Sequence, residues 1–100
     1  MTSIDQLEMA VIRWAEARKI LKYSTPQAQL NKLVEELGEV ANGVNRNKPD
    51  AVKDGIGDML VVLVLLADMH GLSLRECLAC AYTEIRDRKG MMSPEGIFIK

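Results

Sequence analysis

The sequence predicts an all-α protein, a four-helix bundle that assembles into a homo-oligomer. Hydrophobic residues make up 48% of the chain, aromatic residues only 4%, and the apolar residues recur at helical spacing in four stretches. Proline, glycine and capping residues separate these stretches by short connections, which favour antiparallel neighbours. One hundred residues allow one compact domain, so a separate cofactor-binding module is excluded. We expect a helical domain over 1–90 and a tail over 91–100.

The first two helices are predicted from periodicity and capping. Apolar residues place the first from Ile4 to about Leu21, with charges on the opposite face. Ser24-Thr25-Pro26 then supplies a capping hydroxyl followed by proline at the first helical position. The second helix is expected from Pro26 to near Asn45, where the segment Asn-Arg-Asn-Lys-Pro ends it.

The third and fourth helices are predicted from the same two signals, periodicity and capping. The third is expected from Pro49 to His70, with Gly71 as its left-handed stop. Residues 59–67 are apolar on every side, so this helix must be covered all round, which predicts a place at the centre of a homo-oligomer. Ser73-Leu-Arg-Glu76 is a capping box that opens the fourth helix, expected to end near Lys89. In the tail, residues 97–99 are expected to be extended.

Composition and charge exclude several classes of protein. The formal charge of −1 gives no electrostatic reason to expect a nucleic-acid or membrane partner. The longest apolar run has nine residues, whereas a span needs roughly 20, and the N-terminus does not resemble a secretory signal, so we expect a cytoplasmic protein. Cys77 and Cys80 are interpreted as small packing residues, because one histidine leaves a zinc site short of a ligand.

Five acidic residues on the second and third helices are the candidates for chemistry. Glu36 and Glu39 share a helix face, as do Glu35 and Glu39, and like charges at that spacing repel. Asp54 and Asp58, one turn apart, continue a stripe that runs into the apolar part of the third helix. Antiparallel helices can bring the two sets together, and Mg²⁺ prefers such oxygen ligands. A solvated acidic face is the alternative interpretation.

The acidic segments resemble a known family. Lys32-Leu-Val-Glu35-Glu36-Leu-Gly-Glu39-Val, followed by Lys53-Asp54-Gly-Ile-Gly57-Asp58, is similar to the E-E-x-x-E and E-x-x-D signatures of MazG-like nucleoside triphosphate pyrophosphohydrolases. The resemblance covers nearly the whole chain and implies an all-α bundle. It also implies a homodimer or homotetramer that uses Mg²⁺, or alternatively Mn²⁺, to hydrolyse (d)NTP to (d)NMP and pyrophosphate. Such short proteins occur in bacteria and their phages, and a phage-encoded member acts in the host cytoplasm.

The resemblance also assigns roles to residues. It implies that Glu36, Glu39 and Asp58 bind metal, and that Glu35 or Glu36 is the catalytic base. The second motif departs from the family at Gly55, where relatives carry Glu, and we assign Asp54 as the substitute ligand because it shares a helix face with Asp58.

The substrate-binding residues are expected to be cations and one aromatic residue: Lys32, Arg88, Lys89 and Trp14. Lysine and arginine suit phosphate, and tryptophan can stack on a nucleobase, although such a residue is more commonly core. Two alternatives remain: an enzyme like phosphoribosyl-ATP pyrophosphohydrolase, and a non-catalytic helical oligomerisation or regulatory module.

Overall fold

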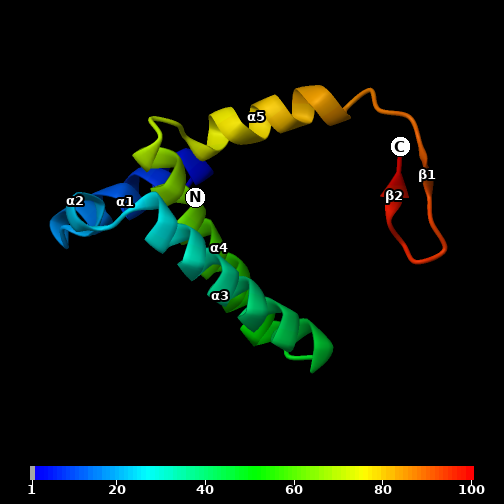
Figure 1. The fold of residues 1–100 in the computed structure, drawn as a ribbon, viewed down its shortest axis with the longest axis horizontal. Coiled ribbons are helices and arrows are strands. Elements are labelled where there is room, and N and C mark those ends of the chain that lie inside the picture. The colour runs from blue at the N-terminus through cyan, green and yellow to red at the C-terminus, as the bar shows by residue number, and fades with distance from the viewer. Residues whose placement is uncertain (1) are drawn as a thin grey trace.

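The computed structural model describes residues 2–100 and confirms the all-α class (Figure 1). Within that range it contains five helices and one short hairpin of strands. In chain order they are α1 (Ile4–Ala17), α2 (Ile20–Tyr23), α3 (Pro26–Asn45), α4 (Pro49–Met69), α5 (Leu74–Ile85), β1 (Met91–Met92) and β2 (Phe98–Ile99).

The first predicted helix is broken in two. It ends at Ala17, and Lys19 takes a left-handed conformation with φ of 61° before the single turn of α2 begins. The Lys19 amide donates to the Glu16 carbonyl at 3.0 Å, so the last turn of α1 is tightened before the chain changes direction. No glycine or proline marks this point in the sequence, so the spacing of apolar residues predicts one continuous helix to about Leu21.

Helices α3 and α4, the two longest helices in residues 2–100, form an antiparallel hairpin (Figure 1). Both begin where expected, with proline in the first turn, and the Thr25 hydroxyl accepts a hydrogen bond from the Ala28 amide at 3.1 Å. Gly71 has φ of 70°, the left-handed conformation predicted after α4.

The core lies around the second half of α4. Ala15 from α1 and four α4 residues, Val62, Val64, Leu65 and Ala67, are buried, whereas Leu60 remains 43% exposed. One copy of the chain therefore leaves part of α4 uncovered, and the homo-oligomer stays a prediction. Within residues 2–100, no single helix is long and apolar enough to cross a membrane, and α4 with α5 meets that test only as a pair bent by 96°.

The C-terminal part differs from expectation in where its helix ends. Helix α5 begins at the predicted capping box but ends at Ile85, so residues 86–90 form a connection rather than a last helical turn. The extended tail is confirmed, because Phe98 and Ile99 pair antiparallel with Met92 and Met91. Figure 1 shows α5 and the strands projecting away from the α3–α4 hairpin. We call residues 74–100 the C-terminal arm.

Candidate metal centre

A close approach of α3 and α4 sets the geometry of the candidate site. Gly55 is buried, and a Cβ atom there would lie 2.5 Å from Val40 Cγ2. Val40 follows Glu39 in sequence, and Gly55 lies three residues before Asp58, so this contact brings the two acidic segments face to face. A side chain at position 55 would therefore require Val40 or the helices to shift.

Three of the predicted ligands come together across the hairpin. Carboxylate oxygens of Glu36, Glu39 and Asp58 lie within 4.8 Å of one another, which is close enough for one cation to bind all three. Glu36 is buried, while Glu39 and Asp58 are exposed to solvent. A set of three carboxylates suits hard divalent cations such as Mg²⁺ and Mn²⁺. We call these three residues the acidic cluster.

Glu36 provides the strongest evidence that the acidic cluster fits a cation. One of its oxygens, Oε1, accepts an ion-pair contact from Lys32 Nζ at 3.2 Å. The other, Oε2, is buried and has no hydrogen-bond partner among the described residues. A buried carboxylate oxygen without a partner is costly, since it has lost water and gained nothing in exchange. A divalent cation among the three carboxylates would provide the missing partner.

Charge interactions inside the acidic cluster also favour a bound cation. The pKa of Glu39 is raised chiefly by the neighbouring Glu36, whose carboxylate would accept a hydrogen bond from protonated Glu39 and whose negative charge disfavours ionised Glu39. The pKa of Lys32 is also raised, chiefly by its hydrogen bond to Glu36 and then by the charge of Glu35. The site therefore holds excess negative charge that one lysine does not fully neutralise.

The other predicted site residues lie at varying distances from the cluster. Glu35 is adjacent, with its side chain 62% exposed and 3.7 Å from Lys32 Nζ. Asp54 is exposed and is not one of the three clustered carboxylates. Trp14 is 44% exposed on α1, where the Arg18 guanidinium lies 4.8 Å from the centre of its ring. Arg88 and Lys89 belong to the connection between α5 and β1, in the middle of the C-terminal arm.

Sequence reasoning missed the pairing that keeps Glu36 in place. Lys32, which we expect to contact phosphate, also lies against Glu36, one helical turn away. The signal was present in the sequence, because a lysine and a glutamate four residues apart on a helix are neighbours.

Comparisons with known proteins agree with this geometry. Residues 24–90 match the family described as the MazG nucleotide pyrophosphohydrolase domain. The chain is 51% identical over 70 residues to an uncharacterized 18.2 kDa protein from the rep-hol intergenic region of Haemophilus phage HP1, covering 70% of this chain and 43% of that protein. It is 41% identical over 64 residues to the uncharacterized protein YpjD of Bacillus subtilis, covering 54% of this chain and 58% of that protein.

The matched region thus spans about half the length of these relatives. No solved structure is significantly similar to this chain. The family match includes α3, α4, α5 and the whole acidic cluster, and it extends over well more than half of the sequence. The chain therefore belongs to the MazG nucleotide pyrophosphohydrolase family.

Proposed function

We propose that this protein hydrolyses nucleoside or deoxynucleoside triphosphates to the monophosphate and pyrophosphate, with Mg²⁺ or Mn²⁺ bound by Glu36, Glu39 and Asp58. The observation that carries the proposal is the buried, unpartnered Oε2 of Glu36 inside a three-carboxylate cluster, in a chain of this family. A solvated acidic face would not bury one of its carboxylates. Asp54, one turn from Asp58, is proposed as an outer contributor to the same site.

The residues in and around the acidic cluster have different proposed roles in the reaction. When bound, the cation supplies positive charge that neutralises the triphosphate and makes water easier to deprotonate. Lys32 keeps the Glu36 carboxylate in place through their 3.2 Å contact. Glu35 is exposed beside the cluster and is free to accept a proton from water, so we assign it as the base. Water then attacks the α-phosphorus, the bond to the bridging oxygen breaks, and pyrophosphate leaves.

The test is a product analysis of the purified protein. We would incubate it with each of the eight common NTPs and dNTPs, and with phosphoribosyl-ATP, in Mg²⁺ or in EDTA, and separate products by anion exchange. Monophosphate and pyrophosphate that disappear in EDTA and in Glu39→Gln, but persist in Glu16→Gln on α1, support the proposal. Release of orthophosphate instead of pyrophosphate would contradict it.

The same experiment separates the alternatives. Turnover confined to phosphoribosyl-ATP would identify an enzyme like phosphoribosyl-ATP pyrophosphohydrolase. Absence of turnover, together with no Mg²⁺-dependent rise in melting temperature, would favour a non-catalytic helical module and overturn the proposal.

A further inference from the structure

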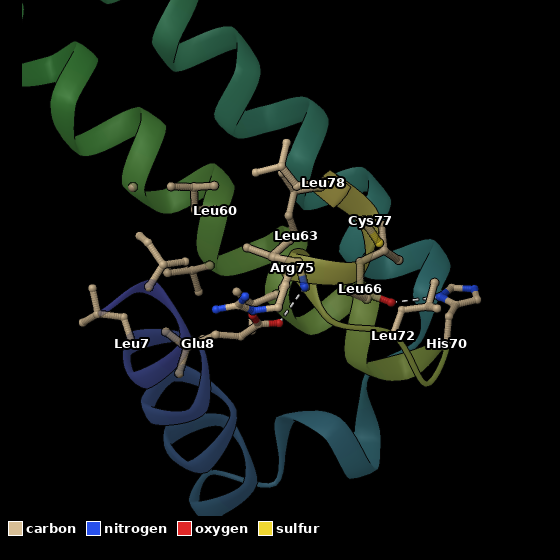
Figure 2. A pocket seen from close by; sticks show the side chains of 17 residues that line it. Leu7, Glu8, Leu60, Leu63, Leu66, His70, Leu72, Arg75, Cys77 and Leu78 are labelled. Atoms are coloured by element: carbon tan, nitrogen blue, oxygen red, sulfur yellow. Dashed lines mark hydrogen bonds between the residues drawn. The ribbon is translucent and has the colours of Figure 1, made fainter. Parts of the chain in front are cut away.

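The described part of the chain buries two carboxylates, Glu8 and Glu36, and each has a different kind of partner. Glu8 lies in the wall of an apolar groove between α1, α4 and the start of α5, where it accepts a hydrogen bond from the Leu74 amide at 2.8 Å (Figure 2). This contact anchors the first turn of α5 to α1. Because a backbone amide is fixed by the helix to which it belongs, the partner of Glu8 cannot turn away.

The partner of Glu36 is a flexible side chain. Lys32 Nζ lies 3.2 Å from Glu36 Oε1 and 3.7 Å from Glu35 Oε1, and the Lys32 side chain is half-exposed. Lysine ends a long flexible chain in a compact charge, and ion pairs open to solvent contribute little to stability. Lys32 can therefore leave Glu36 at small cost. Glu36 Oε2, in contrast, is buried and has no hydrogen-bond partner among the described residues.

Lys32 and a divalent cation would compete for the same negative charge. The pKa of Lys32 is raised chiefly by its hydrogen bond to Glu36, then by the charge of Glu35, and Glu39 acts in the same direction. The ammonium group thus interacts with two of the three carboxylates of the acidic cluster. Two cations at such short distances repel each other, so each weakens the hold of the carboxylates on the other.

Burial keeps Glu36 oriented whether or not Lys32 is beside it. The Glu36 side chain is only 7% exposed, and its carboxylate lies close to that of Asp58 on the facing helix. A side chain packed at an interior contact has few other rotamers available. The contact with Lys32 therefore supplies charge to Glu36 more than it supplies geometry.

We propose that Lys32 is an exchangeable counter-ion of the acidic cluster, which pairs with Glu36 and Glu35 until a divalent cation binds and then turns to a phosphate group of the nucleotide. Lys32 is in this role a positioning residue, and the inference rests on the proposed function because the phosphate belongs to the triphosphate substrate. The exchange joins the phosphate contact expected from the sequence to the ion pair seen in the structure.

The exchange predicts that loss of the Lys32 charge changes two affinities in opposite directions. The cluster should bind a divalent cation more tightly, because a competing positive charge is gone. A triphosphate should bind more weakly, because a charged donor is gone. A residue that only supports the structure of the site would weaken both when it is replaced.

The metal half is tested by Mn²⁺ binding, measured by electron paramagnetic resonance without nucleotide in mildly alkaline buffer, where protons compete least. Lys32→Met keeps an unbranched side chain without its charge, and the Mn²⁺ dissociation constant should fall at least about threefold. Lys32→Arg keeps the charge and should bind Mn²⁺ as wild type does. The matched control is Lys22→Met, which removes an exposed lysine from α2 and should change nothing.

The phosphate half is tested by calorimetric titration with the magnesium complex of inorganic tripolyphosphate. Lys32→Met should weaken binding at least about tenfold, and Lys32→Arg should retain most of the affinity. Helical circular dichroism shows that each variant has folded.

Each other result has a defined meaning. If Lys32→Met binds Mn²⁺ no more tightly than wild type, or if Lys22→Met tightens binding equally, Lys32 does not compete at the cluster and the exchange is overturned. Unchanged tripolyphosphate binding in Lys32→Met would overturn it too. If wild type binds no Mn²⁺, the proposed metal centre itself fails and the exchange fails with it. If wild type binds Mn²⁺ but hydrolyses no nucleotide, the proposed function fails while the two titrations still decide the exchange.

Discussion

The α3–α4 hairpin and the C-terminal arm differ in which side chains they bury and which they expose. The hairpin buries a charged residue, Glu36, within a tight helix contact. The arm exposes large apolar residues such as Leu78 and Tyr82. A buried charge is costly unless it is paired, and Lys32 pairs with only one oxygen of Glu36. The hairpin therefore favours contact with a cation, whereas the exposed apolar side chains of the arm favour contact with an apolar surface.

The largest effect is expected from the acidic cluster. Asp58→Asn or Glu39→Gln should lower turnover by about 100-fold or more, because each removes a metal ligand. Asp54→Asn should cost less than about tenfold, since Asp54 lies outside the cluster. Initial rates over a Mg²⁺ titration measure both changes. A loss in Asp54→Asn equal to that in Asp58→Asn would show that the site extends further along α4 than the cluster does.

A second prediction concerns the anchor of the arm. Glu8→Ala should lower the free energy of unfolding by about 1.5–3 kcal/mol, because it removes a buried charged acceptor from the Leu74 amide. Asp5→Asn is the control, because its pair with Arg75 is exposed and should contribute little. Urea unfolding measures both variants. Equal effects would mean that the anchor works through net charge rather than through the hydrogen bond.

A third prediction tests the tightness of the hairpin. Gly55→Ala places a Cβ 2.5 Å from the Val40 side chain, so overpacking should outweigh the gain in helix propensity and destabilise the fold by about 1–2 kcal/mol. Gly38→Ala on α3 meets no atom within 4 Å and should stabilise by up to about 1 kcal/mol. Thermal unfolding in EDTA compares the two. Stabilisation by Gly55→Ala would show that α3 and α4 do not meet closely there.

The smallest expected effect is on the pH dependence of stability. Because the pKa of Glu39 is raised above its ordinary value of 4.5, the stability that its proton provides is present at low pH. That stability is lost as the pH rises through the raised pKa, when Glu39 ionises beside Glu36. Without metal, the urea midpoint of wild type should therefore fall relative to Glu39→Gln across this range. A rise instead would contradict the crowding of negative charge in the cluster.

Much of this architecture could be predicted because its signals are local. Pro26 and Pro49 in first helical turns, and the Ser73 capping box, fixed where three helices begin. The acidic cluster could also be predicted from the sequence, since Glu36 and Glu39 share a helix face and the turn between α3 and α4 is short. The family motif then singled out Asp58 on the facing helix.

What escaped prediction depends on contacts between residues distant in sequence. Glu8 lies beside the apolar stripe of α1, and its partner, the Leu74 amide, is 66 residues away. The reason for Gly55 becomes visible only when Val40 is placed against it. The left-handed Lys19 has no glycine or proline to announce it. In each case the local structure depends on tertiary contacts, which the periodicity of the sequence does not show.

Mn²⁺ binding, measured by electron paramagnetic resonance without nucleotide, tests directly whether the acidic cluster is the metal centre. We expect wild type and Glu16→Gln to remove free Mn²⁺ signal equally, and Glu36→Gln, Glu39→Gln and Asp58→Asn each to weaken Mn²⁺ binding by at least about tenfold. Unchanged binding in those three variants would show that the buried Glu36 oxygen does not face a cation, and the acidic cluster would then not be the metal centre.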